Sequence, residues 1–314
     1  MKKYQIGYIG LTHLGLTYLT ASVIKNNRVI AFDNDSLKIK KLKKNEFVST
    51  ERGLVNKLIG LKKKILFTDN IKLLNKCDMI FISCDIKTNS KNESNYHQIN
   101  KYLNNIKRSI KNRIPIIILS QVKPGFTRLI KLEKFKVYYQ VETLIFGDAI
   151  KQALKPKRII VGKKNKDSKI DIKYSNYLKS FNCPIIEMNY ESAELCKIAI
   201  NILLASNLTA TNTLANLAEE LKADFYDIMP ALKLDQRIGK KSYIYPGLGI
   251  SGGNIERDIV TVKKLVQEHK IKKNHLMTSF QEISENRKIW TFDTIKKIIK
   301  KNKISKIGIF GFTY

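Results

Sequence analysis

The chain has 314 residues, of which 43% are hydrophobic, and this is enough for a folded protein with a sizeable core in one or two domains. Its formal net charge is +31, but the lysines are spread along the whole length rather than gathered in one stripe, which argues against nucleic acid as the main partner. The sequence has no long apolar run and no signal-peptide cleavage site, so we expect a cytoplasmic protein with no membrane segment. It also has no CxxC pair and no zinc-type spacing, so we expect no metal.

The first motif is a candidate dinucleotide-binding turn. The apolar stretch YQIGYIG predicts a β-strand, and a helical pattern, LTYLTASVIKN, follows the turn. Against the G-x-G-x-x-G fingerprint, the first and third glycines are present, but Thr12 replaces the second, which normally lets the backbone approach a pyrophosphate. We therefore expect either a displaced dinucleotide or a phosphate that accepts the Thr12 hydroxyl. The turn residues expected to contact the cofactor are Gly10, Thr12, His13, Leu14 and Gly15.

The second predicted strand strengthens this interpretation. RVIAFDND is apolar and reaches Asp33, 18 residues beyond Gly15. An acidic residue at this point accepts hydrogen bonds from an adenosine ribose and repels a 2′-phosphate, so we expect NAD rather than NADP as the cofactor. The alternative is that Asp33 caps the following helix, although Asp35 could do so instead.

Further strands alternate with amphipathic stretches as far as residue 188: KILFT, DMIFISC, IPIIILS, KVYYQVE and RIIVG. This rhythm predicts an α/β fold, a Rossmann-type, doubly wound parallel sheet over residues 1–188. Ligands of such sheets lie beyond the carboxyl ends of the strands, which places Asp33, Gln121 and Glu142 around one crevice. We expect Gln121 to contact the cofactor. Glu142 could instead be a charge at the N-terminus of a helix.

A long helix is predicted from Tyr190 onwards, since more than thirty positions contain neither proline nor glycine. Its apolar residues lie on more than one face, so we expect subunits to pair along it in an all-α dimerisation domain over residues 189–302. Lys197 and Asn201 share one face, with Glu194 on the same side. Partial burial would suit Lys197 to proton transfer. A lysine whose stem covers apolar surface is the alternative.

The last third of the chain contains the glycine-rich stretch GLGISGGNIERD, residues 247–258, preceded by Arg237. So much glycine indicates positive φ angles or close approach of the backbone to a ligand, and we expect anion or sugar binding here. A helix capped near Asp258 and a final long helix follow. The end, KISKIGIFGFTY, predicts a strand that begins a truncated third βα unit over residues 303–314.

Several motifs in this order resemble the UDP-glucose/GDP-mannose dehydrogenase family over essentially the whole chain. The stretches that carry the resemblance are GLTHLG, Asp33, SQVKPG, ETLIFGDA with PKRIIVG, AELCKIAIN, LDQRIG, GLGISGGNIERD and KIGIFGFTY. The resemblance implies a nucleotide-sugar substrate, NAD as cofactor, oxidation of a sugar 6-alcohol to the acid in two steps, and a homodimer paired through the central helix.

The resemblance also implies roles for individual residues. Lys197 and Asn201 correspond to catalytic helix residues near the reacting carbon, and Glu142 to the acidic residue of thioester hydrolysis. Asp258 corresponds to an aspartate that orders a water molecule or the lysine. The residues that correspond to substrate-binding positions are Arg237, Gly249, Gly252, Gly253 and Arg257, of which Arg257 replaces a lysine.

Asn254 stands where the family has its nucleophilic cysteine. Oxidation of an aldehyde through a thioester needs a thiolate, whereas an amide can only donate a hydrogen bond to a carbonyl oxygen. We therefore hypothesise a single NAD-linked hydride transfer with Lys197 as acid/base. Two alternatives stay open: a β-hydroxyacid or 6-phosphogluconate type dehydrogenase, which needs no cysteine, and a catalytically silent paralogue that binds nucleotide sugars.

Overall fold

The computed structural model describes residues 3–250, 252–272 and 274–310. The chain divides into two compact units, and each is described by itself. The N-terminal unit comprises Met1–Asn89 and Ser94–Ile198, and the helical unit comprises Ser90–Glu93 and Ala199–Tyr314. The division therefore falls inside the long helix, whereas residue 188 was the boundary expected from the sequence.

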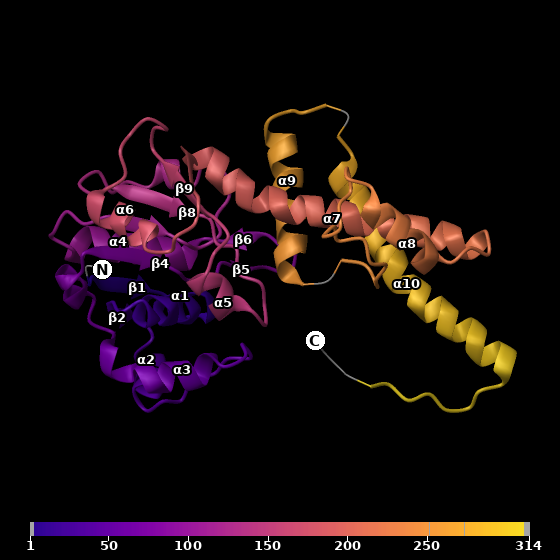
Figure 1. The fold of residues 1–314 in the computed structure, drawn as a ribbon, viewed down its shortest axis with the longest axis horizontal. Coiled ribbons are helices and arrows are strands. Elements are labelled where there is room, and N and C mark those ends of the chain that lie inside the picture. The colour runs from indigo at the N-terminus through magenta and orange to yellow at the C-terminus, as the bar shows by residue number, and fades with distance from the viewer. Residues whose placement is uncertain (1–2, 251, 273, 311–314) are drawn as a thin grey trace. The chain divides into compact units, whose positions relative to one another are not determined.

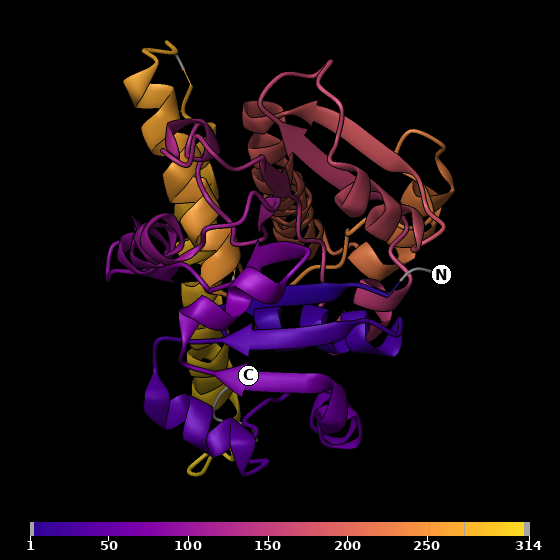
Figure 2. The same cartoon turned by 90° about the vertical axis from the view of Figure 1, so that its left-hand side faces the viewer.

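An eight-stranded sheet forms the middle layer of the N-terminal unit (Figures 1 and 2). Its order is β10-β9-β8-β7-β4-β1-β2-β3, and all neighbours are parallel except β8 and β9. The strands are β1 (Gln5–Ile9), β2 (Arg28–Phe32), β3 (Ile65–Thr68), β4 (Met79–Ile82), β7 (Ile116–Ile118), β8 (Val137–Gln140), β9 (Ile159–Lys163) and β10 (Ile185–Asn189). A short hairpin, β5 (Lys87–Thr88) with β6 (Ser94–Asn95), follows β4.

The predicted Rossmann-type sheet is confirmed, with two corrections. Every strand expected after β2 is formed, but β9 runs antiparallel to β8, so the sheet is mixed rather than parallel. The run RIIVG is apolar throughout, and such a run carries no information about strand direction. Strand β10 was not predicted, because it is a mostly exposed edge strand without apolar alternation.

Both faces of the sheet are covered. One hydrophobic cluster joins one face to α1, α2, α3, α5 and α6, and a second joins the other face to α4 and the start of α7. The helices are α1 (His13–Ile24), α2 (Ser36–Lys43), α3 (Leu54–Leu61), α4 (His97–Ser109), α5 (Ala149–Leu154) and α6 (Ile172–Lys179), with short 3-10 helices at Lys62–Lys64, Ile71–Lys76 and Thr127–Leu129. Burial on both faces explains why the central strands β4 and β7 are apolar at every position.

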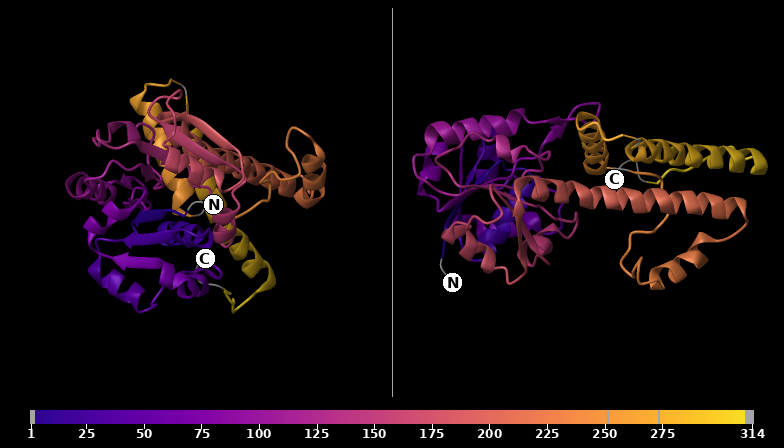
Figure 3. Two further views of the ribbon diagram at one scale, coloured as in Figure 1. Left: turned by 60° about the vertical axis from the view of Figure 1, so that its left-hand side comes forward. Right: turned by 90° about the horizontal axis from the view of Figure 1, so that it is seen from above.

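Helix α7 (Tyr190–Glu220) confirms the predicted long helix and runs without a break in Figure 3. The helical unit also contains α8 (Phe225–Leu234), α9 (Gly253–Glu268) and α10 (Leu276–Asn302). Among its described residues, two small hydrophobic clusters are formed: one joins the middle of α7 to α9 and the start of α10, and the other joins the end of α7 to α8.

Two expectations for the C-terminal third are corrected. Helix α9 begins at Gly253 rather than near Asp258, so Asn254 and Arg257 are helical. The described part of the expected terminal strand, residues 304–310, is neither strand nor helix, because it forms no ladder with another described strand. The remainder, residues 311–314, lies outside the described residues.

Among the described helices, α7 is long and apolar enough to cross a membrane, with a mean hydropathy of 1.2 over its most apolar stretch, 28% of which is buried. This corrects the expectation that no stretch of the chain has that character. Core helices of soluble proteins pass the same test, so the finding is weak evidence for a membrane segment.

Candidate functional site

Two glycines allow the tight turn after β1. Gly10 has a φ of +88°, and a Cβ there would lie 2.8 Å from the backbone nitrogen of Cys84. A Cβ on Gly15 would overlap the carbonyl oxygen of Gly10 and lie 2.8 Å from Ser83 Oγ. Glycine is therefore required at both positions by the approach of α1 to β1 and to the end of β4.

Thr12 is engaged within the turn. Its hydroxyl donates to the carbonyl oxygen of Ser83 at 3.2 Å, and it precedes α1 without capping the helix through its side chain. The first-turn amides of His13, Leu14 and Gly15 are therefore left for a ligand, and a helix N-terminus attracts anions. Because the Thr12 hydroxyl already donates to Ser83, this geometry favours a displaced dinucleotide over a phosphate that accepts the Thr12 hydroxyl.

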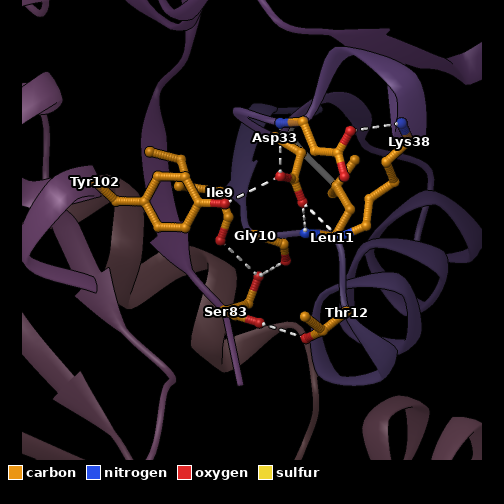
Figure 4. Close-up of polar contacts among 9 residues, drawn as sticks. Ile9, Gly10, Leu11, Thr12, Asp33, Lys38, Ser83 and Tyr102 are labelled. Atoms are coloured by element: carbon orange, nitrogen blue, oxygen red, sulfur yellow. Dashed lines mark hydrogen bonds and ion pairs between the residues drawn. The ribbon is translucent and has the colours of Figure 1, made fainter. Parts of the chain in front are cut away.

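The Asp33 carboxylate lies at the centre of a hydrogen-bonded network (Figure 4). Its Oδ2 accepts from the Leu11 N–H at 2.9 Å and the Lys38 ammonium at 3.0 Å, and its Oδ1 accepts from the Tyr102 hydroxyl at 3.1 Å and the Asp35 N–H at 3.2 Å. Asp33 does not cap α2, because Asp35 does. Burial alone would raise the pKa of Asp33, but the Leu11 N–H and the Lys38 ammonium outweigh it, and the pKa is lowered.

A buried glutamate holds the loop that carries Gln121. Glu194 on α7 is fully buried and accepts hydrogen bonds from the N–H groups of Gly125 at 2.6 Å and Thr127 at 2.8 Å. Burial raises the pKa of Glu194, although these hydrogen bonds oppose the rise. Gln121 is half-buried in the same loop, after the end of β7.

Lys197 and Glu142 form an ion pair in the N-terminal unit. The Lys197 ammonium lies 3.0 Å from Glu142 Oε2, and the two side chains are only 12% and 17% exposed. Of the two interpretations that the sequence left open for Lys197, the structure supports a partly buried side chain and not one directed into solvent. Glu142 follows β8 well before α5 begins, so it is not a charge at a helix N-terminus. The structure therefore brings together two residues to which the sequence assigned separate roles.

The segment between β8 and α5 is held by a residue that the sequence analysis missed. Glu51 is buried and accepts from the N–H groups of Gly147 at 2.9 Å and Ala149 at 2.8 Å. Within the segment, the Leu144 N–H donates to Glu142. No local pattern reveals Glu51, because its partners lie almost a hundred positions away in the sequence.

The helical unit contains a second buried group of polar residues. Asn201 Nδ2 on α7 donates to Asp258 Oδ2 at 2.6 Å, and the guanidinium of Arg257 lies 3.4 Å from Asp258 Oδ1. Arg257 and Asp258 are both buried, and Arg257 Nη2 has no hydrogen-bond partner in the described structure. Asn201 lies one helical turn after Lys197 on α7.

The glycine-rich stretch combines close packing with positive φ angles. Gly249 has a φ of +97°, and a Cβ there would lie 2.8 Å from the Ser284 carbonyl oxygen. Gly252 has a φ of +92° and is the N-cap of α9, whereas a Cβ on Gly253 would meet nothing within 4 Å. Asn254 lies exposed in the first turn of α9.

Arg237 is placed apart from these groups. Its guanidinium pairs with the Asp235 carboxylate at 2.6 Å, and its side chain is 89% exposed. Within one chain it therefore does not contribute to a buried site. The described residues also contain no group of three or more His, Cys, Asp or Glu side chains that could hold a metal ion.

Comparison with protein families gives two matches that together cover most of the chain. Residues 4–181 match the NAD binding domain of the UDP-glucose/GDP-mannose dehydrogenase family, and residues 191–286 match its central domain. The matched segments correspond closely to the sheet-containing part and to α7 through the first part of α10.

Known proteins similar to this chain agree with these matches. The chain is 29% identical over 286 residues to UDP-glucose 6-dehydrogenase of Rickettsia typhi, with 85% of this chain and 63% of that protein aligned. It is 27% identical to UDP-N-acetyl-D-mannosamine dehydrogenase of Methanocaldococcus jannaschii, with 99% and 72% aligned. A UDP-glucose dehydrogenase structure from Pyrobaculum islandicum shares the fold at 22% identity, with a TM-score of 0.81 over 91% of this chain and 68% of that one.

Proposed function

Because this chain belongs to the UDP-glucose/GDP-mannose dehydrogenase family, we propose that it is an NAD-dependent oxidoreductase that transfers a single hydride to or from a nucleotide sugar. The observation that supports this most is the partly buried pair of Lys197 and Glu142 at the carboxyl end of β8. The family match also favours a nucleotide sugar over the β-hydroxyacid substrates of the first alternative.

The N-terminal unit is an NAD-binding domain of this family. In our proposal the amides of the turn from Gly10 to Gly15 bind the pyrophosphate, Asp33 binds the adenosine ribose, and Gln121 contacts the cofactor beyond β7. NAD, when bound, supplies the acceptor for a hydride from a carbinol carbon.

Lys197 acts as the acid/base of the proposed reaction. An alcohol that loses a hydride must also lose its hydroxyl proton, and an amine in hydrogen-bond reach can take it. Because an ammonium group cannot accept a proton, Lys197 first gives one to Glu142, 3.0 Å away, and the amine so formed takes the hydroxyl proton. Asn201, one turn later on α7, orients the substrate oxygen, and Asp258 holds the Asn201 amide in place through the 2.6 Å hydrogen bond.

Asn254 limits the proposed reaction to one step. An amide does not form the thioester through which an aldehyde is oxidised to an acid, so the product retains the aldehyde oxidation state. Asn254 can still donate a hydrogen bond to a carbonyl oxygen. In the proposed substrate site, the remaining contacts come from Gly249, Gly252, Gly253 and Arg257, and Arg237, which lies apart from them within one chain, contributes from the second subunit of a dimer.

The test is to supply NAD with UDP-glucose, GDP-mannose or UDP-N-acetylmannosamine and to follow NADH. We expect one NADH per sugar with the accepted substrate, and loss of at least about 100-fold in kcat for Lys197→Met, as removal of an acid/base group predicts. The control is Lys163→Met, which removes another buried lysine that is paired with a glutamate, Glu187, in the same unit. Two NADH per sugar would contradict the one-step reaction.

A second candidate function is supported by Asn254 itself. A paralogue that binds a nucleotide sugar without turnover needs no nucleophile at this position. Calorimetry separates the two functions: heat of binding for both NAD and a sugar nucleotide, no NADH, and no effect of Lys197→Met would favour the binding protein.

The proposal also includes a homodimer paired through α7. Leu203, Leu214 and Leu217 are 66%, 49% and 53% exposed, and their spacing places them on one face of the helix. A row of exposed leucines on a long helix is typical of a surface that another subunit covers. We place this dimer in the cytoplasm, with no membrane and no nucleic acid as partner.

A further inference from the structure

The Asp33 carboxylate is already saturated with donors. Oδ2 accepts from the Leu11 N–H and the Lys38 ammonium, and Oδ1 accepts from the Tyr102 hydroxyl and the Asp35 N–H. A carboxylate has about four acceptor positions, so all of them are taken. A ribose hydroxyl can therefore donate to Asp33 only after one of the four donors has moved away.

The four donors differ in how easily they can leave. Leu11 and Asp35 donate from the backbone of the glycine turn and of the α2 N-cap. Tyr102 on α4 is 2% exposed, and its ring packs edge-on against Phe32 at a centroid distance of 6.3 Å. Lys38 is the exception, because its side chain is 36% exposed and a lysine ammonium is flexible and well hydrated.

We propose that Tyr102 is a positioning residue for the adenosine ribose of the cofactor. By holding Oδ1, the Tyr102 hydroxyl fixes the plane of the Asp33 carboxylate while Lys38 and a ribose hydroxyl exchange at Oδ2. The ribose is then recognised through one carboxylate oxygen rather than through both. This inference rests on NAD binding by the N-terminal unit and is independent of the sugar chemistry.

Nothing in the local sequence singles out Tyr102. It lies 69 positions from Asp33 and reads as an ordinary core residue of an amphipathic helix. Its ring does belong to the core, and its position in the hydrophobic cluster is what makes the hydroxyl immobile. An immobile donor is what positioning requires, since a mobile one would follow the carboxylate rather than restrain it.

The test compares the binding of NAD with that of its analogue lacking the adenosine 2′-hydroxyl, by calorimetry. In the unchanged protein we expect the analogue to bind about tenfold more weakly, the effect of one hydrogen bond to a charged group. In Tyr102→Phe we expect NAD itself to bind about fivefold to tenfold more weakly and the penalty for the missing hydroxyl to shrink to about twofold. A role confined to packing would weaken both ligands equally and leave their ratio unchanged.

Tyr8→Phe is the matched control. Tyr8 is also buried in the N-terminal unit, and its hydroxyl is hydrogen-bonded to Ser22 at 2.8 Å, on the other face of the sheet. We expect this variant to keep the ratio of the two ligands. An unchanged ratio in Tyr102→Phe, or tighter binding of NAD, overturns the proposal.

A double variant, Asp33→Asn with Tyr102→Phe, separates the positioning role from a change in fold. If Tyr102 acts through Asp33, Tyr102→Phe should have no further effect on NAD affinity in an Asp33→Asn background. Additive losses in the double variant would overturn the proposal even where both single variants bind weakly. Failure of sugar oxidation would leave these binding results untouched.

Discussion

The two units of this chain bury their apolar side chains to very different degrees. In the N-terminal unit, two extensive clusters cover both faces of the sheet, and the central strands are almost completely buried. In the helical unit, two small clusters involve only parts of α7, α8, α9 and α10, and large apolar side chains remain exposed on all of these helices except α9. The N-terminal unit buries both faces of its sheet, whereas the helical unit leaves large apolar side chains exposed, as is typical of surfaces that bind another molecule.

The largest effect is expected from charging the exposed face of α7. Leu203→Asp combined with Leu214→Asp places two carboxylates where we propose that a second subunit packs. We expect the dimer dissociation constant to rise by at least about 100-fold, because two central interface leucines are replaced by groups that resist desolvation. Light scattering during gel filtration measures this, and NAD binding should persist.

The matched control is Leu37→Asp, because Leu37 is exposed to a similar degree on α2 of the N-terminal unit. This variant should keep the oligomeric state of the unchanged protein. A chain that is monomeric from the start, or a double variant that stays dimeric, would contradict the proposed pairing.

A smaller effect is expected from filling the glycine turn. In Gly15→Ala, the new Cβ would overlap the Gly10 carbonyl oxygen, and neither backbone can yield without moving α1. We expect the free energy of unfolding of the N-terminal unit to fall by about 3 kcal/mol and NAD binding to be lost. Gly60→Ala in α3 is the control, since its Cβ would meet nothing within 4 Å and the change favours a helix. Urea unfolding compares the two variants, and equal stability would mean that the turn can relax.

The sequence predicts those features of the fold and of the candidate site that depend on residues close together in the chain. Gly10, Gly15 and Asp33 were identified because a strand, a turn and a helix impose their demands within a short stretch. Lys197 and Asn201 were placed on one face by helical spacing alone. Contacts between distant segments could not be predicted, because they depend on the tertiary fold. Examples are the pairing of Lys197 with Glu142, the two amides that Glu51 accepts from, and the hydrogen bond from the Tyr102 hydroxyl to Asp33. The direction of β9 depends on the tertiary fold in the same way.

The smallest effect concerns two buried carboxylates of the N-terminal unit whose pKa values shift in opposite directions. The pKa of Asp33 is lowered, so its stabilising contribution is complete above its unfolded value of about 3.9 and is lost as the pH falls through the folded pKa. The pKa of Glu194 is raised, so its ionisation opposes folding above the folded pKa, and that penalty disappears as the pH falls towards the unfolded value of about 4.3.

Asn and Gln substitutions should therefore change the pH dependence of the unfolding free energy in opposite ways. Asp33→Asn should flatten the loss of stability below about pH 4, and Glu194→Gln should remove the gain of stability that accompanies acidification towards about pH 4.5. Urea titrations across this range measure the slopes, which are informative even where a substitution lowers absolute stability by leaving an amide poorly paired. Parallel curves for Glu194→Gln and the unchanged protein would show that Glu194 keeps an ordinary affinity for protons, and that the Gly125 and Thr127 amides fully balance its burial.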